Sequence, residues 1–220
     1  MSRQEELFPT RHPDDPAAPE EASLPEGITL QEGFVALERC KQLMAGLQQS
    51  VAWTQGEIVI FGKVIPLPRL TAWYGDEGAG YEYSGIRNEP LEWTAELARL
   101  RDEVGQAAGV SFNSVLLNLY RDGSDSVSWH SDDEPELGPD PTIASVSLGA
   151  TRRFKLRHKA TRETVVRDLE DGSLLLMSGN SQRLWEHCIT KTRRPVGKRI
   201  NLTFRVVGTE VQGSPDVRLR

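Results

Sequence analysis

The sequence predicts an α+β fold in which helices pack on one face of a jelly roll. Two amphipathic segments come first, and short β-rich segments separated by Gly, Asp, Pro or Ser follow Gly109. Many short strands at this spacing are typical of a barrel or a two-sheet sandwich. The chain has 220 residues, enough to bury the core of one such domain and leave a tail.

Composition argues against several classes of protein. Hydrophobic residues make up 38% of the chain and charged residues 26%, as in a soluble globular protein. No apolar run reaches the roughly 18 residues of a membrane span, and the first residues lack the apolar segment of a secretory signal. Cys40 and Cys188 make no disulfide framework, so we expect free, partly buried thiols in a reducing cytoplasm, or in the nucleus of a eukaryote.

The net charge of −6 is unevenly distributed along the chain. Residues 150–220 hold 16 basic and 7 acidic residues, concentrated in "TRRFKLRHK" and "KTRRPVGKR". Such clusters can neutralise phosphates locally even in an acidic protein. Basic runs are more often simply solvated faces, so this pattern alone does not identify a nucleic-acid partner.

The first half of the chain is predicted to hold a tail and two helices. Residues 1–23, rich in Pro, Asp and Glu, are expected to be a disordered tail, and residues 24–112 an N-terminal extension. Apolar residues at helical spacing predict one helix over about 34–47 and a second within 91–109, where Gly109 is the stop. The expected core residues of the two helices are Phe34, Leu37, Leu43, Met44 and Leu47, and then Leu97, Leu100 and Val104.

Residues 113–207 are predicted to form the β-rich core, followed by a C-terminal tail over 208–220. Side chains two apart on a strand share a face, so "RINLTFRV" has an apolar face and a polar face. The polar face could serve solubility or form the floor of a cavity. The apolar face holds Ile200, Leu202, Phe204 and Val206, the polar face Arg199, Asn201, Thr203 and Arg205, and "SVLLNLY" places Leu116, Asn118 and Tyr120 together.

The segment "SWHSDDE" (128–134) contains a possible metal site. His130 and Asp132 are two residues apart, so both can point at one position, and His187 ends another predicted strand. Two histidines and one carboxylate form the triad that holds non-haem Fe(II) and leaves coordination positions open for dioxygen and a cosubstrate. Taken singly, each histidine could be a structural residue, and the acids could be a solvated loop.

The arginines extend this pattern. Iron oxygenases of this type commonly use 2-oxoglutarate, whose distal carboxylate needs a cation inside the barrel. Arginine binds a carboxylate through paired donors, and Arg199 and Arg205 have suitable chemistry and orientation. Asn118 and Tyr120 offer further donors.

The chain resembles the AlkB family of Fe(II)/2-oxoglutarate-dependent dioxygenases. The resemblance is carried, in family order, by "NLY" (118–120), "HSD" (130–132), "ASVSLG" (144–149), "WEH" (185–187) and "RINLTFR" (199–205), and it covers roughly residues 24–207. It implies a double-stranded β-helix core and the iron ligands His130, Asp132 and His187. It also implies 2-oxoglutarate contacts from Asn118, Tyr120, Arg199, Asn201, Thr203 and Arg205, with Arg199 at the distal carboxylate.

Residues 60–85 are similar to the nucleotide-recognition lid of the animal homologue that repairs duplex DNA. Ile60, Phe61 and Gly62 match its hydrophobic finger, and an apolar wedge can stabilise an opened duplex. The alternative is an ordinary strand end with a buried Phe. The expected substrate contacts are Tyr83, stacking opposite His130; Tyr74 and Tyr81, as stackers or phosphate contacts; Arg69 and Lys63, at phosphates; and Asp133 and Glu134, accepting from an exocyclic amine.

The resemblance implies oxidative demethylation of bases such as 1-methyladenine and 3-methylcytosine in DNA, and hence direct repair of alkylation damage. The reaction would use Fe(II), 2-oxoglutarate and dioxygen and release succinate and formaldehyde. We expect a monomer acting on single- or double-stranded methylated DNA, with no membrane contact. An RNA demethylase or protein hydroxylase with the same chemistry remains an alternative. A non-catalytic metal-binding jelly roll is a further one, against which the inward-facing Arg199 and Arg205 argue.

Overall fold

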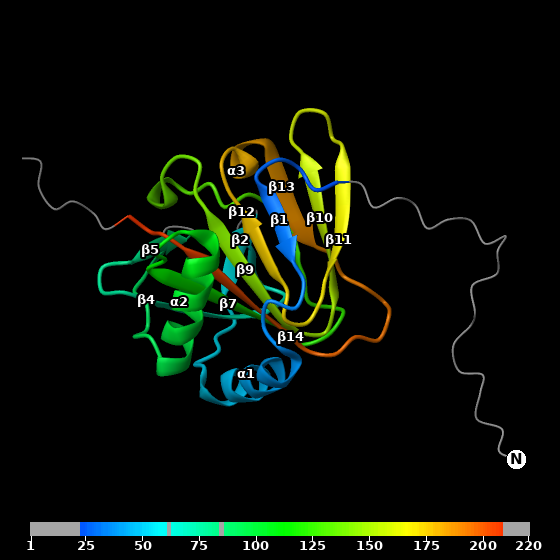
Figure 1. Ribbon diagram of the computed structural model, residues 1–220. Coiled ribbons are helices and arrows are strands. Elements are labelled where there is room, and N and C mark those ends of the chain that lie inside the picture. Colours follow the sequence, from blue (N-terminus) through cyan, green and yellow to red (C-terminus); the bar gives the residue numbers. More distant parts are fainter. Residues whose placement is uncertain (1–22, 61–62, 84–85, 209–220) are drawn as a thin grey trace, which may run out of the picture.

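Two antiparallel sheets form the centre of the molecule, and two helices cover the larger one (Figure 1). The computed structural model describes residues 23–60, 63–83 and 86–208. The predicted tails, 1–23 and 208–220, lie almost entirely outside these ranges and remain predictions. The double-layered antiparallel architecture agrees with the predicted jelly roll with supporting helices.

The larger sheet has six strands in the order β1-β12-β9-β14-β7-β4. Its core is β14, which pairs antiparallel with β7 on one side and β9 on the other. The strands are β1 (Ile28–Gln31), β4 (Leu70–Gly75), β7 (Ser114–Tyr120), β9 (Ile143–Gly149), β12 (Leu174–Met177) and β14 (Arg199–Arg205).

The smaller sheet has four strands in the order β11-β10-β13-β8. These are β8 (Val127–His130), β10 (Arg152–His158), β11 (Thr164–Leu169) and β13 (Trp185–Ile189). The strands β7 to β14 coincide with the β-rich segments expected after Gly109. The edge strands β1 and β4 were not predicted, because each comes from the extension and pairs only with distant parts of the chain.

Helix α2 (Ala95–Ala108) agrees with the prediction. The Thr94 hydroxyl accepts the backbone N–H of Leu97 at 3.2 Å, and Gly109 ends the helix with a φ of 67°. That left-handed conformation favours glycine and is a common helix stop. Leu97, Leu100 and Val104 are all fully buried, as their spacing predicts.

Helix α1 (Leu37–Ser50) begins three residues later than predicted. Ala36 is extended at the N-cap, so Phe34 packs against the core from outside the helix. The buried face then consists of Cys40, Leu43 and Leu47. The prediction that Leu37 is a core residue is wrong, since it is 61% exposed. Among the described residues, neither helix has the length and apolar composition needed to span a bilayer.

The buried apolar residues form two clusters. The larger cluster lies between the helices and the six-stranded sheet and receives Ile200, Leu202 and Phe204 from β14. The smaller cluster joins the two sheets. Val206 departs from the predicted apolar face and is 40% exposed, because β14 ends at Arg205.

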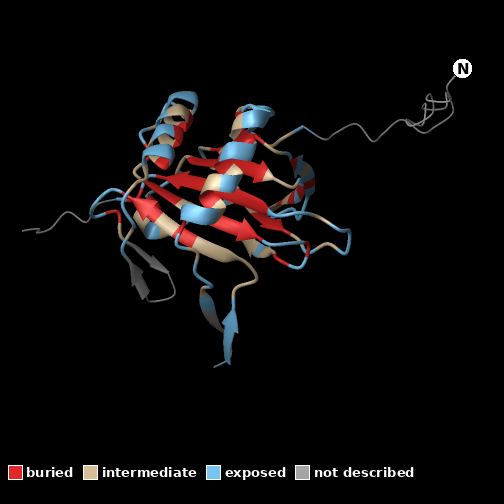
Figure 2. Ribbon diagram, turned by 90° about the horizontal axis from the view of Figure 1, so that it is seen from below, coloured by how far each residue is buried: buried red, intermediate tan, exposed pale blue. Residues whose placement is uncertain are grey.

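Two hairpins come from the extension. One pairs β2 (Glu57–Ile60) with β3 (Lys63–Pro66), and the other pairs β5 (Tyr81–Tyr83) with β6 (Ile86–Asn88). Strand β3 is exposed throughout and projects from the body of the molecule (Figure 2). The predicted finger residues Phe61 and Gly62 lie outside the described residues, so the nucleotide-recognition lid remains a prediction.

Candidate metal centre and cosubstrate pocket

Three side chains from two distant parts of the chain meet between the sheets. His130 ends β8, Asp132 follows two residues later, and His187 on β13 lies opposite His130 in the strand register. One possible ligand atom from each residue lies within 4.8 Å of the other two. Asp132 and His187 are buried, and His130 is half-buried. The structure thus brings together the three residues that the sequence suggested as iron ligands.

Hydrogen bonds orient these side chains. The Nδ1 atom of His130 lies 2.9 Å from the carbonyl oxygen of Ser128. Because a carbonyl only accepts, Nδ1 carries the proton and donates this hydrogen bond, and Nε2 is available for a metal. Arg205 donates from Nη2 to Oδ1 of Asp132 at 2.7 Å. The other carboxylate oxygen of Asp132 lies 3.9 Å from Nε2 of His187.

The electrostatics favour the protonation states that bind metals. Burial is the largest single influence on Asp132 and would raise its pKa, but Arg205, His187 and His130 together outweigh it and hold that pKa at about 2. Burial, together with the positive field of His130 and Arg205, lowers the pKa of His187 to about 3 despite the attraction of Asp132. At neutral pH the cluster therefore offers an ionised carboxylate and a neutral imidazole, the forms that act as ligands.

Arg199 is the buried cation of the pocket, with 1% of its surface exposed, as the sequence predicts. Its Nη2 donates to the hydroxyl of Ser147 at 3.0 Å, but Nε and Nη1 have no hydrogen-bond partner within the described part of the chain. No carboxylate there forms an ion pair with it. Burial lowers the pKa of Arg199, and the neighbouring Tyr120 opposes that shift. Such a buried cation is costly without an anion, so the pocket suits an anionic ligand.

One pocket connects the metal cluster with Arg199. The polar face of β14 forms part of its wall, and Asn201 donates to the Ser145 hydroxyl at 2.7 Å and accepts from Thr203 at 2.9 Å. All six residues expected at 2-oxoglutarate line this pocket: Asn118, Tyr120, Arg199, Asn201, Thr203 and Arg205.

Sequence reasoning missed several residues around the site. Ser145 and Ser147 share one face of β9, and the alternation in "ASVSLG" could have identified them, since Ala144, Val146 and Leu148 are in the core. No sequence pattern could have identified Gln182. It lies in the short helix α3 (Ser181–Leu184), and its contact with Asp132 spans 50 residues of sequence.

The residues expected to bind substrate lie in different parts of the structure. Arg69 lies in the pocket wall, where its Nε donates to Oδ1 of Asn118 at 2.8 Å, which does not favour the expected phosphate contact. Tyr74 is 4% exposed in the larger core, so its ring has no face available for a base, and the stacking role expected for it is not supported.

The remaining substrate candidates either lie near the metal cluster or have side chains outside the part of the chain that the structure describes. Asp133 is exposed and forms an ion pair with Lys159 at 3.2 Å, and Glu134 is half-buried beside it. Both follow Asp132 directly. The backbone of Tyr81 and Tyr83 is in β5, but their side chains, like Phe61, lie outside what the structure describes.

Comparison with known proteins agrees with this geometry. Residues 27–205 match the model of the 2OG-Fe(II) oxygenase superfamily. The rat protein "Alpha-ketoglutarate-dependent dioxygenase alkB homolog 3" is 42% identical over 193 residues, which cover 83% of this chain and 65% of the relative. The mouse "DNA oxidative demethylase ALKBH2" is 41% identical over 172 residues, covering 73% of this chain and 72% of the relative.

The chain belongs to the AlkB family of 2OG-Fe(II) oxygenases. It spans slightly less than two thirds of the length of the rat relative. The solved structure of OsALKBH1 superposes with a TM-score of 0.64 and 19% identity, covering 84% of this chain and all of that one, so it supports the fold alone.

AlkB-family membership implies Fe(II), 2-oxoglutarate and dioxygen, and the residues present fit these groups. The His-Asp-His cluster has the donor set preferred by non-haem Fe(II), and Arg199 supplies an unpaired buried cation for a carboxylate.

Proposed function

We propose that this AlkB-family protein is an Fe(II)- and 2-oxoglutarate-dependent dioxygenase that removes methyl groups from base nitrogens in DNA. The observation that carries the proposal is the occurrence, in one pocket, of the His130–Asp132–His187 cluster and the buried guanidinium of Arg199. A non-catalytic metal-binding module would have no need of a buried guanidinium. Relatives that share about two fifths of the sequence carry names that describe dioxygenases and a DNA oxidative demethylase.

The two arginines are assigned to opposite ends of 2-oxoglutarate. Arg205 contacts Asp132, so it is close to the metal cluster and to the keto-acid end of a chelating cosubstrate. Arg199 has no such contact with the cluster and is assigned to the distal carboxylate, with the Ser147 hydroxyl orienting its guanidinium. Asn118 and Tyr120, which line the same pocket, complete the polar wall.

Dioxygen is the oxidant: one of its oxygen atoms would convert 2-oxoglutarate to succinate and carbon dioxide, and the other would hydroxylate an N-methyl group, after which formaldehyde leaves and the base is restored. Fe(II), held by His130, Asp132 and His187, would supply this chemistry when bound. The protein's own residues bind and orient the reactants. The apolar side chains Val127, Phe154 and Ile189 line the pocket and limit the access of water to it. The half-buried ring of His130 presents a surface against which a flipped base could stack.

Acidic groups beside the cluster provide a basis for selecting damaged bases. A methyl group on N1 of adenine or N3 of cytosine makes the base cationic, and Asp133 and Glu134 directly follow the ligand Asp132. Carboxylates and aromatic faces favour a cationic base over its neutral parent. The ion pair of Asp133 with Lys159 would have to yield for Asp133 to take part.

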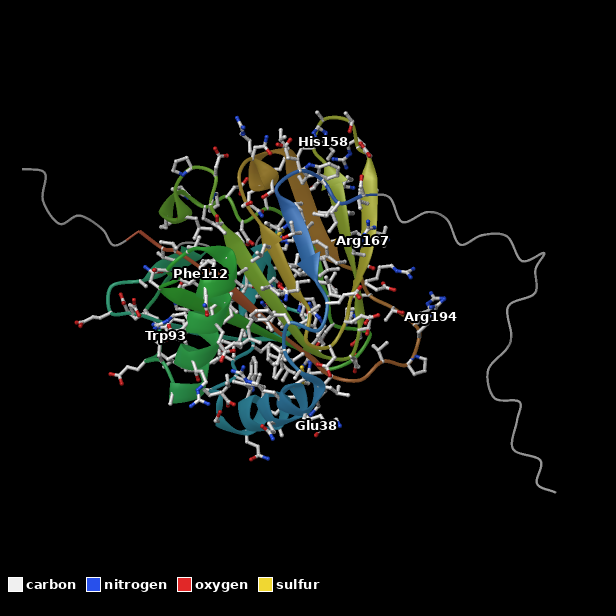
Figure 3. All side chains as sticks on the ribbon, viewed as in Figure 1. Glu38, Trp93, Phe112, His158, Arg167 and Arg194 are labelled. Atoms are coloured by element: carbon white, nitrogen blue, oxygen red, sulfur yellow. The ribbon has the colours of Figure 1, made fainter. Side chains whose placement is uncertain are left out.

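The basic surface supports a nucleic-acid substrate only in part. Arg153, Arg157 and Arg162 on or beside β10 pair with Asp168 or Glu186, which reduces the local positive charge. Arg194, on the loop between β13 and β14, is exposed at the edge of the molecule (Figure 3). RNA is therefore the second candidate substrate. We expect the protein to be a monomer and to act in the cytoplasm or, in a eukaryote, in the nucleus.

The test is to incubate the iron-loaded protein with labelled 2-oxoglutarate and an oligonucleotide containing one 1-methyladenine, as single-stranded DNA, duplex DNA and RNA. Equimolar succinate and formaldehyde with either DNA form would support the proposal. Product from RNA alone would make RNA the substrate. Succinate without demethylation of any oligonucleotide would indicate another substrate, and no succinate at all would reject the oxygenase activity.

The predicted finger is tested in the same assay with Phe61→Ala. If Phe61 is a wedge, this variant should lose activity on duplex DNA and keep it on single strands, because only the duplex requires support after a base leaves the stack. Val64→Ala, an exposed apolar residue on β3 of the same hairpin, is the matched control. An equal loss on all three substrates would exclude the wedge role.

A further inference from the structure

Gln182 is a buried polar residue next to the metal cluster but outside the ligand set. It is 2% exposed, and its Oε1 accepts the backbone N–H of Asp132 at 2.9 Å. Its Nε2 lies 3.4 Å from the sulfur of Met177, a residue of the pocket wall. Both ends of the amide are therefore occupied, and one of them holds the main chain of a ligand.

The position of Gln182 in the chain gives this contact its importance. Gln182 lies in α3, and β13, which carries His187, begins directly after that helix. The hydrogen bond to Asp132 thus ties the segment of one ligand to the segment of another. Arg205 holds the carboxylate of Asp132 from the opposite sheet, so Gln182 and Arg205 fix the backbone and the side chain of the same ligand.

We propose that Gln182 is a positioning residue that fixes Asp132 relative to His187 and thereby sets the affinity of the site for its metal ion. The inference rests on the proposed metal-dependent function. The neighbouring Ser131, whose hydroxyl donates to the carbonyl of Trp185 at 3.0 Å, is a second link between the same two segments. That link acts on the residue between His130 and Asp132, whereas Gln182 holds Asp132 itself.

The rival explanation is a purely structural role, in which Gln182 only satisfies a buried N–H. The two explanations differ in what a substitution changes. A structural residue affects the stability of the fold, whereas a positioning residue also weakens metal binding in the protein that remains folded. Residues that orient metal ligands typically contribute about 10–100-fold in metal affinity or activity.

Two substitutions separate the acceptor from the size of the side chain. Gln182→Met keeps the length and removes the acceptor for the Asp132 N–H. Gln182→Glu keeps the length of the side chain and an acceptor oxygen for the Asp132 N–H. The conservative variant should therefore bind metal more tightly than Gln182→Met.

A matched control lies outside the pocket. Asn113 also holds distant backbone with its amide, since it accepts from the N–H of Val207 at 2.8 Å and donates to the carbonyl of Val207 at 2.7 Å. It is not among the residues that line the pocket. Asn113→Leu should lower the melting temperature and leave metal affinity unchanged.

The experiment is a calorimetric titration of the full metal-free chain with Mn(II), in the presence of 2-oxoglutarate, together with the melting temperature of each variant. We expect Gln182→Met to bind Mn(II) about 10–100-fold more weakly than the wild-type protein, with Gln182→Glu in between. Equal Mn(II) affinity of Gln182→Met and the wild-type protein, with only a lower melting temperature, would overturn the inference.

Two further outcomes are distinguishable. If the wild-type protein itself does not bind Mn(II), the proposed function fails and the inference fails with it. If Gln182→Met does not fold, Gln182→Asn takes its place, because it keeps the amide but is one methylene too short to reach Asp132. Wild-type Mn(II) affinity in that variant would likewise overturn the inference.

Discussion

The two sheets of this protein differ in what covers them and in what they contribute to the site. The six-stranded sheet is backed by α1 and α2 across the larger apolar core, and it supplies Arg199, Asn201 and Arg205 to the pocket. The four-stranded sheet contributes no residue to the larger core, and it carries His130 and His187. The cations for an anionic cosubstrate and the imidazoles for a metal thus come from opposite layers.

This difference explains why the pocket lies between the sheets. The ion pair between Arg205 and Asp132 crosses that space and connects the two contributions. The larger sheet therefore combines stability with anion binding, whereas the smaller sheet is primarily a carrier of metal ligands. Substitutions in the two layers should separate these contributions.

The largest expected effect is the loss of the metal by His187→Ala on the smaller sheet. Removing a ligand should weaken Mn(II) binding by more than the roughly 10–100-fold typical of groups that only orient ligands, and should abolish succinate release. His158, on β10 of the same sheet, is the control, because it packs edge-on against Trp185 outside the pocket (Figure 3). His158→Ala should bind Mn(II) normally, and equal losses in both variants would argue against a specific metal site.

The next effect concerns the stability of the larger layer. Leu100 on α2 is fully buried in the larger core, so Leu100→Ala should lower the free energy of unfolding by about 2–5 kcal/mol in urea denaturation. Leu91→Ala, at a residue 44% exposed, should change it by less than about 0.5 kcal/mol. Both folded variants should keep wild-type Mn(II) affinity. A selective loss of affinity in Leu100→Ala would show that the two layers are not separable.

Arg199→Met should act in opposite directions on stability and on cosubstrate binding. It should weaken 2-oxoglutarate binding about 10–100-fold, since each charge-assisted hydrogen bond contributes roughly 1.5–3 kcal/mol. The ligand-free variant should melt at a higher temperature, because a buried guanidinium without a carboxylate is removed.

Arg152 provides the contrast for that variant. It is equally buried, but it donates to the carbonyl oxygens of Asp122, Asp125 and Thr190 at 2.8–3.1 Å. Arg152→Met should therefore lower the melting temperature and affect 2-oxoglutarate binding less. If Arg199→Met also destabilised the ligand-free protein, its guanidinium would have a structural partner that the account omits.

The smallest effect is a pH dependence of the metal-free protein. The native pKa of His187 is about 3, below its ordinary value of 6.5, so between these values the unfolded chain takes up a proton that the native protein does not. The stability from neutral His187 is complete above pH 6.5 and is lost as the pH falls toward 3. The melting temperature should drop between about pH 7 and about pH 5, and drop less in His187→Gln. Identical slopes would contradict the buried neutral imidazole.

The sequence predicted those features that depend on local periodicity. Alternation in "RINLTFR" placed Arg199 and Arg205 on one face and Phe204 on the other, because side-chain direction on a strand follows from the backbone alone. Apolar spacing and Gly109 gave α2 with its buried residues. The convergence of His130 and Asp132 on one position could likewise be predicted, because the two residues are two apart on one short segment.

Features that depend on distant contacts were missed or misassigned. Leu37 fits the helical stripe, yet the helix starts only there, and the side chain faces solvent. Tyr74 has the chemistry of a stacking residue, but its side chain packs in the larger core and is buried there. The role of Gln182 depends on a hydrogen bond across 50 residues, which no local pattern encodes.

The central claim, that two layers form one binding site, is tested most directly by linkage. Calorimetry would compare 2-oxoglutarate binding with and without Mn(II) in the wild-type protein, His187→Ala and Arg199→Met. The account predicts that Mn(II) strengthens 2-oxoglutarate binding in the wild-type protein, that His187→Ala removes this gain, and that Arg199→Met binds Mn(II) but holds 2-oxoglutarate weakly. Mn(II) and 2-oxoglutarate binding independently of each other in the wild-type protein would contradict it.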